Sequence, residues 1–144
     1  MTASSRMFAA VLCIALPLGA LSGCSVPGVR GPLDGTRWRL VGWSISPIHP
    51  ESVTITAGFA NGQISGNSGV NSYSGSYTEG AGRTFSVGSI SSTLMAGPEE
   101  AMRAEAAYLT LLEETRSYQR ADGTLTLYDA GGNESLIFEA SDES

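Results

Sequence analysis

The sequence predicts an α+β fold, in which a curved, mainly antiparallel β-sheet of about eight strands wraps around one α-helix. Two observations predict it. Short segments in which apolar and polar residues alternate are separated by glycine-containing turns, the pattern of antiparallel strands. One segment rich in Ala, Leu and Glu, the strong helix formers, interrupts this series after five strands and precedes three more.

The first predicted strand, residues 36–43, shows the alternation clearly. Trp38 and Leu40 lie on one face, and Arg37 and Arg39 lie on the other. Four further strands are expected at residues 53–59, 63–65, 71–77 and 84–90. The dipeptide Asn61-Gly62 predicts a hairpin between the second and third strands, because both residues accept the backbone angles of a tight turn.

Residues 71–77 are rich in Ser and Gly and could be mistaken for a flexible linker. We interpret them as a strand, because Tyr73, Gly75 and Tyr77 share one face and alternate with serines. Glycine within a strand often permits close approach of a neighbouring segment. Gly75 is therefore expected to lie where a helix or a facing strand packs closely.

The helix is predicted over residues 98–115. Pro98 suits the first turn, and Glu99 and Glu100 complement the positive end of the helix dipole. The predicted buried stripe consists of Met102, Ala106, Leu109 and Leu112, widened by Tyr108. Since one helix cannot bury its apolar face alone, it must pack against the sheet.

Three strands follow the helix. Residues 118–120 and 125–128 are joined by Asp122-Gly123, a strong hairpin signal, and residues 136–138 form a short apolar strand.

The composition excludes several classes of protein. The chain carries 14 acidic and 8 basic residues, a net charge of −6, and its bases are all Arg without a cluster. Nucleic-acid binding needs clustered Lys and Arg to neutralise phosphates, so no nucleic-acid partner is expected. Two cysteines are too few for a disulfide-dense scaffold or a four-thiolate zinc site.

The N-terminus is predicted to be a lipoprotein signal peptide, residues 1–23. Arg6 precedes an apolar run over residues 7–20, which is shorter than the roughly 20 residues that span a bilayer. The segment that ends in Gly23 and Cys24 resembles the lipobox of bacterial lipoproteins. That resemblance implies cleavage between these two residues and lipid attachment at Cys24. The Pro and Gly content of residues 24–33 predicts an extended tether. An ordinary secreted protein, or an uncleaved anchor, is the alternative.

Residues suited to catalysis are scarce. His49 is the only histidine and lies beside Pro50 in a predicted surface loop, where a solvated role is expected, and no second histidine is available for a metal site. The sequence has no Gly-x-Ser-x-Gly elbow and no phosphate-loop lysine. The paired carboxylates at 99–100 and 113–114 are interpreted as solvated helix ends. We therefore expect no catalytic residue, metal or cofactor.

Three groups of residues together resemble the META domain (HslJ-like) family, over about residues 33–140. The first contains Trp38; the second carries Gly69, Asn71, Tyr73, Gly75 and Tyr77; the third, just before the helix, carries Thr93 and Met95. The resemblance implies a strongly curved sheet around a helix and a link to envelope stress tolerance. It implies no catalytic residues, and the motif residues are expected to be structural.

The chain departs from the family pattern at two positions. Val70 and Gly97 occupy positions where the family commonly has cysteines. Because both cysteines are replaced together, we hypothesise that these two residues lie close to each other, between the tyrosine-containing strand and the start of the helix. Their replacement removes any redox role that the resemblance could imply.

The expected protein is an envelope lipoprotein, exported and held at a membrane through Cys24. It has a tether, a META-like domain over residues 34–140 and an acidic tail over residues 141–144. The domain is expected to be monomeric and non-catalytic, and to bind a protein or another envelope component in stress tolerance. The alternative is a carrier that holds a lipid or a small apolar ligand in the curved sheet. A hydrolase that uses His49 is a third, weaker hypothesis.

Overall fold

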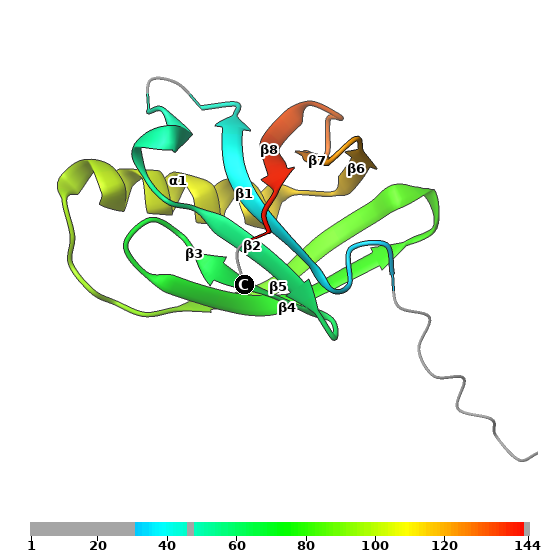
Figure 1. The fold of residues 1–144 in the computed structure, drawn as a ribbon, viewed down its shortest axis with the longest axis horizontal. Coiled ribbons are helices and arrows are strands. Elements are labelled where there is room, and N and C mark those ends of the chain that lie inside the picture. The colour runs from blue at the N-terminus through cyan, green and yellow to red at the C-terminus, as the bar shows by residue number, and fades with distance from the viewer. Residues whose placement is uncertain (1–30, 46–47, 143–144) are drawn as a thin grey trace, which may run out of the picture.

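A computed structural model of the chain describes residues 31–45 and 48–142. The predicted signal peptide, Cys24 and most of the tether lie outside these residues. Five strands precede the α-helix and three follow it, as the sequence predicts (Figure 1). The elements are β1 (Thr36–Trp43), the 3-10 turn η1 (Pro50–Ser52), β2 (Thr56–Ala60), β3 (Gln63–Asn67), β4 (Ser72–Gly80), the 3-10 turn η2 (Ala81–Arg83), β5 (Thr84–Ser92), α1 (Glu99–Glu114), β6 (Ser117–Ala121), β7 (Thr124–Tyr128) and β8 (Glu134–Ala140).

The eight strands follow one another in sequence order around a closed antiparallel barrel, and β8 pairs with β1 to complete it. The α+β fold class is confirmed, but the closure of the sheet was not predicted. The closure is uneven, because β5 and β6 are paired only through Thr84 and Ser117, whereas β6 and β7 share five residue pairs. The connection from β5 to β6 is α1, which packs against β5 and β8.

The barrel interior is filled by one hydrophobic core. Its aromatic rings contact one another with centroid distances from 4.9 Å, for Phe59 and Tyr77, to 6.4 Å, for Tyr108 and Phe138. Alternation therefore placed the inward residues of the strands correctly. The buried core residues are Leu33, Trp38, Leu40, Ile55, Ala57, Phe59, Ile64, Tyr73, Tyr77, Phe85, Tyr108, Leu111, Leu112, Tyr118, Leu125, Leu127, Leu136 and Phe138.

The two predicted hairpins are present. Asn61 and Gly62 turn from β2 into β3 with φ angles of 52° and 75°. Asp122 and Gly123 turn from β6 into β7 with φ angles of 49° and 75°. Both pairs occupy the left-handed region at two successive residues, which matches the right-handed twist of a hairpin.

The predicted buried stripe of α1 is only partly correct. Tyr108 and Leu112 are buried, but Ala106 is exposed, and Met102 and Leu109 are half-buried. The buried face consists of Ala104, Glu105, Tyr108, Leu111 and Leu112. The predicted face differs from the observed one because the prediction considered only apolar residues. It therefore omitted Glu105, whose carboxylate is buried among hydrogen-bond donors.

Gly75 does allow a close approach, but the neighbour is β5, the strand paired beside β4, and neither the helix nor a facing strand as predicted. A Cβ atom at Gly75 would lie 3.1 Å from the carbonyl oxygen of Ser89. The pairing between β4 and β5 shifts register just after Gly75, as in a β-bulge. The bulge brings the backbone of β5 toward the glycine.

Residues 31–33 pack against one end of the barrel. Leu33 is fully buried, and its N–H donates to Glu79 Oε1 at the end of β4, at 3.3 Å. Arg120 Nη1 donates to the carbonyl oxygen of Pro32, at 2.6 Å. The packed chain therefore extends N-terminal to Asp34, the first residue of the predicted domain. Among the helices of the described residues, none is long and apolar enough to cross a membrane.

Candidate functional site

Two other motif residues, Thr93 and Met95, meet at the side chain of Asn71. Its Oδ1 accepts hydrogen bonds from Thr93 Oγ1, at 2.8 Å, and from the N–H of Met95, at 2.7 Å. Its Nδ2 donates to the carbonyl oxygen of Met95, at 3.2 Å, and to Glu105 Oε1, at 2.7 Å. The amide is oriented by its partners, since a carbonyl and a carboxylate can only accept. Asn71, Thr93 and Met95, predicted as motif residues, thus form one cluster.

Glu105 completes this cluster from the helix. Its Oε2 accepts from Ser68 Oγ at 2.7 Å, from the N–H of Asn71 at 2.8 Å and from the N–H of Val70 at 3.3 Å. Burial raises the pKa of Glu105, but the hydrogen bonds from Ser68 and Asn71 outweigh it, so the pKa is lowered from its ordinary value. The carboxylate is therefore ionised at neutral pH and is stabilised by dipoles.

Sequence reasoning missed Glu105 as a site residue. A signal was present, because Glu105 lies three residues before Tyr108 and seven before Leu112, which places it on the buried helix face. A carboxylate on a buried face must meet donors, and the serine and asparagine of the preceding motif are suitable ones.

Gly69 has a specific structural role beside this cluster. Its φ angle is 124°, a conformation that side chains rarely adopt, and a Cβ there would lie 3.3 Å from the carbonyl oxygen of Ala101. Glycine therefore lets the β3–β4 loop approach α1 closely enough for Glu105 to bond its backbone. We call this hydrogen-bonded cluster the clasp; its residues are Ser68, Asn71, Thr93, Met95 and Glu105. It joins the β3–β4 loop, the segment after β5 and helix α1.

The motif tyrosines lie in the core beyond the clasp. Tyr73 Oη is 2.6 Å from Tyr108 Oη, and it donates to the carbonyl oxygen of Thr56 at 2.9 Å. Burial raises the pKa of both phenols well above the ordinary value. Burial, with the nearby carboxylates of Glu79 and Asp34, also raises the pKa of Tyr77 to about 12. These phenols stay protonated at neutral pH and pack within the core.

Trp38, the remaining motif residue, lies in the hydrophobic core. Its indole is 2 % exposed, and Nε1 donates to Thr36 Oγ1 at 2.7 Å. The guanidinium of Arg120 lies 5.6 Å from the ring centroid, a cation–π distance.

The two positions without the family's cysteines lie side by side. A Cβ atom at Gly97 would be 3.4 Å from Val70 Cβ and 2.7 Å from Val70 Cγ2. The hypothesis that these two residues are close is therefore confirmed.

The clasp presents an exposed loop, residues 93–98, which we call the end loop. The hydrogen bonds of Asn71 hold the N–H and the carbonyl oxygen of Met95, while the side chain of Met95 is 60 % exposed. Leu94, beside it, is 95 % exposed. A fixed backbone that points apolar side chains into solvent is an arrangement suited to binding.

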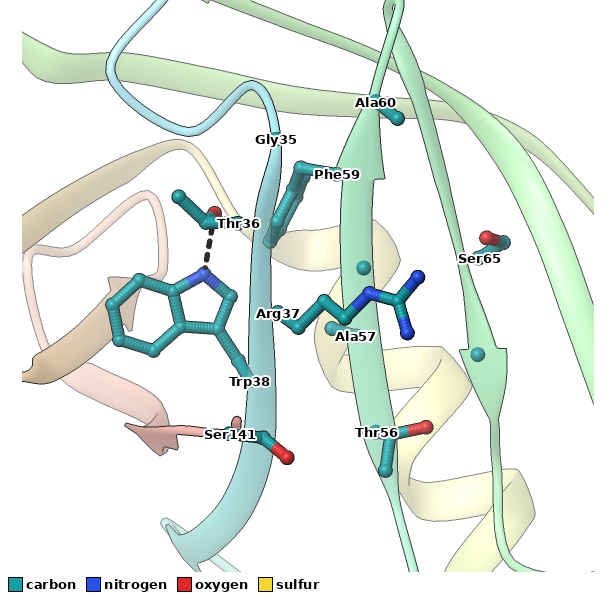
Figure 2. A pocket seen from close by; sticks show the side chains of 12 residues that line it. Gly35, Thr36, Arg37, Trp38, Thr56, Ala57, Phe59, Ala60, Ser65 and Ser141 are labelled. Carbon is teal, nitrogen blue, oxygen red and sulfur yellow. Dashed lines mark hydrogen bonds between the residues drawn. The ribbon is translucent and has the colours of Figure 1, made fainter. Parts of the chain in front are cut away.

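A recess of about 510 Å³ lies on the outer face of β1, β2 and β3. Figure 2 shows the side chain of Arg37 extending from β1 across β2, and the short side chains of Thr56 and Ser65 at its border. Gly58 and Gly66 also line it. Its lining also includes Trp38, Ala57 and Phe59, which belong to the hydrophobic core.

The other candidates do not combine into a site. His49 is exposed, and so are the carboxylate pairs at 99–100 and 113–114, as predicted. Within residues 31–45 and 48–142, no group of three or more His, Cys, Asp or Glu side chains is placed to hold a metal ion. The predicted lipid attachment at Cys24 lies outside the described residues.

Comparisons with known proteins agree with this architecture. The family model described as "META domain" matches residues 31–142. An NMR structure of a protein from Burkholderia xenovorans is 30 % identical, with a TM-score of 0.61, over 77 % of this chain and 85 % of that chain. A crystal structure of a DUF4847 family protein from Bacteroides vulgatus, 14 % identical, matches 81 % of this chain and 100 % of that chain with a TM-score of 0.57, which shows the fold alone. No curated protein matches.

Proposed function

The chain belongs to the META domain family, and from that premise we propose that it is an envelope lipoprotein whose domain binds a protein or another envelope component in stress tolerance. In this proposal Cys24 carries the lipid, and residues 24–30 connect the membrane to the barrel. The domain contributes binding rather than chemistry.

The observation that carries the non-catalytic part is that the polar groups of the Asn71 cluster bond one another. Glu105 is the buried carboxylate of the cluster, and its two oxygens accept four hydrogen bonds from Ser68, Val70 and Asn71. A general base needs a free lone pair within reach of a substrate proton. A buried carboxylate that accepts four hydrogen bonds stabilises the fold. We therefore expect the domain to act by binding at its surface.

The anchor is supported by the sequence and by arithmetic. Each buried CH₂ contributes about 0.8 kcal/mol, and two acyl chains hold a protein stably where one is marginal. A diacylated Cys24 would thus keep the domain at a membrane surface. Gly31, where the described chain begins, lies beside Glu79 at one end of the barrel.

Cell fractionation of a Cys24→Ser variant tests the anchor. We expect the protein to leave the membrane fraction and appear in the soluble extracytoplasmic fraction. Cys13→Ser is the matched control, since Cys13 lies in the predicted signal peptide, and it should leave membrane retention unchanged. Retention of Cys24→Ser at the membrane would contradict the lipoprotein proposal.

A carrier of apolar ligands is the weaker candidate. Large side chains fill the barrel interior, and the recess in Figure 2 has the charged side chain of Arg37 along it, which suits an apolar ligand poorly. Mass spectrometry of the purified Cys24→Ser protein under native conditions tests this alternative. A stoichiometric co-purified lipid would favour the carrier over the binding module.

A further inference from the structure

We propose that the end loop is the docking surface of the domain, and that its partner is a protein with an apolar pocket flanked by Lys or Arg. The inference rests on the proposed function for the location of the partner, at the envelope. It names the surface and the chemistry that the proposed function leaves open.

The first step is the exposure of two apolar side chains. Leu94 is 95 % exposed and Met95 is 60 % exposed, and they are the large hydrophobic residues that the described structure leaves most exposed. Single exposed apolar residues are ordinary on protein surfaces. Two adjacent ones on a loop are more informative when the loop is held in place.

The second step is that the end loop is held. Asn71 binds the backbone of Met95 through both its N–H and its carbonyl oxygen, and Thr93 N–H donates to the carbonyl oxygen of Ser72 at 3.0 Å. Asn71 is in turn fixed by Glu105. Because the loop is ordered before binding, little conformational entropy is lost when a partner covers it.

The third step is the position of the end loop relative to the anchor. Residues 31–33 pack beside Glu79, at the end of β4, whereas Asn71 and the end loop lie at its beginning (Figure 1). The nine residues of β4 span about 27 Å. If the lipid anchor joins the barrel beside Glu79, the end loop at the opposite end of β4 points away from the membrane. This position favours a protein partner over the bilayer.

The fourth step is charge. Glu99 and Glu100 follow the end loop directly, and both are exposed. Arg103 pairs with Glu99 one turn along the helix, which leaves Glu100 to face a partner. Carboxylates beside apolar anchors complement a pocket flanked by basic residues. They repel an anionic lipid surface, and they repel a second copy of this chain, whose net charge is −6.

Site-specific photo-crosslinking in intact cells tests the inference on the full-length, lipidated chain. A photoreactive amino acid replaces Leu94, and in a control chain it replaces Gln119, which is exposed on β6. We expect one discrete protein adduct from position 94 and none from position 119. Reversing the adjacent charges with Glu99→Lys and Glu100→Lys should lower the adduct yield about five-fold. Glu113→Lys with Glu114→Lys, the exposed pair at the other end of α1, should leave it unchanged.

Other outcomes overturn the inference. They are an adduct with phospholipid, an adduct with a second copy of the chain, equal yields from the two positions, no adduct, or a yield that ignores the charge at 99 and 100. Thermal melting of each variant separates lost docking from lost folding. If the charge reversal unfolds the domain, the salt dependence of the adduct from position 94, with Glu99 and Glu100 unchanged, replaces it, because rim ion pairs weaken with ionic strength. The Cys24→Ser fractionation tests the anchor separately, so the two failures are distinguishable.

Discussion

At the scale of single residues, Glu105 is the side chain on which the clasp depends. Replacing it with Gln keeps the size and removes the charge. The substitution converts one carboxylate oxygen into an NH₂ group. Both Glu105 oxygens face hydrogen-bond donors, so this NH₂ group would point at another donor and could accept no hydrogen bond from it. We expect Glu105→Gln to lower the free energy of unfolding by about 2–3 kcal/mol, since hydrogen bonds to a charged group contribute more than neutral ones. Urea denaturation measures this, and Glu114→Gln, at an exposed position, should change stability by less than about 0.5 kcal/mol.

The lowered pKa of Glu105 adds a pH dependence to this comparison. A carboxyl group whose pKa is lower in the folded state contributes stability above the ordinary value of 4.5, and loses it as the pH falls through the lowered pKa. The difference in unfolding free energy between wild type and Glu105→Gln should therefore shrink on acidification below 4.5. Taking the difference cancels the carboxylates that the two proteins share. A difference that stays constant or grows would show that Glu105 is not ionised in the fold.

Met95 gives a second prediction at this scale. Hydrogen peroxide can transfer an oxygen atom to the thioether to form the sulfoxide, with water as the other product. Met95 is 60 % exposed on a held loop, whereas Met102 is half-buried on α1. We expect the sulfoxide to accumulate several-fold faster at Met95 than at Met102, because the reaction needs access to the sulfur. Peptide mapping by mass spectrometry measures both sites in one sample, and equal rates would argue against the exposed position of Met95.

At the scale of elements, Val70 and Gly97 tie the start of β4 to the end loop by contact alone. A Cβ at Gly97 would lie 3.4 Å from Val70 Cβ, close to the separation in disulfides. In a Cys24→Ser background, the double variant Val70→Cys and Gly97→Cys should form a disulfide and gain about 2–4 kcal/mol of stability when oxidised. Gly97→Ala alone should destabilise, since its Cβ would lie 2.7 Å from Val70 Cγ2. Free thiols at positions 70 and 97 of the oxidised double variant, detected by alkylation and peptide mass spectrometry, would contradict this pairing.

The same scale shows what local patterns could and could not predict. Trp38 and Leu40 were placed inside correctly, because a period of two assigns strand faces without knowledge of the partner strand. The face of α1 was partly wrong, because Glu105 is buried only when the β3–β4 loop supplies its donors. Those donors are more than thirty residues away in sequence. The sequence thus predicted Asn71, Thr93 and Met95 as motif residues. It did not predict the contacts of Asn71 with Glu105.

At the scale of the whole molecule, closure of the barrel is the feature that local signals could not predict. Hairpins between adjacent strands follow from their turns, but the pairing of β1 with β8 joins the two ends of the domain and depends on the accumulated curvature of the sheet. The single pair between Thr84 and Ser117 also depends on where α1 ends. Arg116 helps to fix the end of α1, since its Nη1 donates to the carbonyl oxygen of Glu113 at 2.8 Å. We call the contact between β5 and β6 at Thr84 and Ser117 the joint.

This joint predicts where the barrel opens first. Strand β5 pairs with β4 along most of its length, but on its other side it bonds β6 only near Thr84, where the N–H of Phe85 donates to the carbonyl oxygen of Arg116 at 2.9 Å. Strand β4 has paired strands on both sides. Local opening follows the lowest density of contacts, so the amides of β5 should exchange with solvent at least about ten-fold faster than those of β4.

Hydrogen exchange followed by mass spectrometry tests this on peptides that cover residues 72–80 and 84–92. Weakening the contact between β5 and β6 should increase the difference in exchange rate between β5 and β4. Phe85→Leu removes ring contacts with Phe59, Tyr77 and Tyr118, so it should accelerate exchange in β5 and β6 more than in β3. Uniform acceleration across all strands would instead mean that the barrel opens as one cooperative unit, with α1 joining β5 to β6 as firmly as a strand pair would.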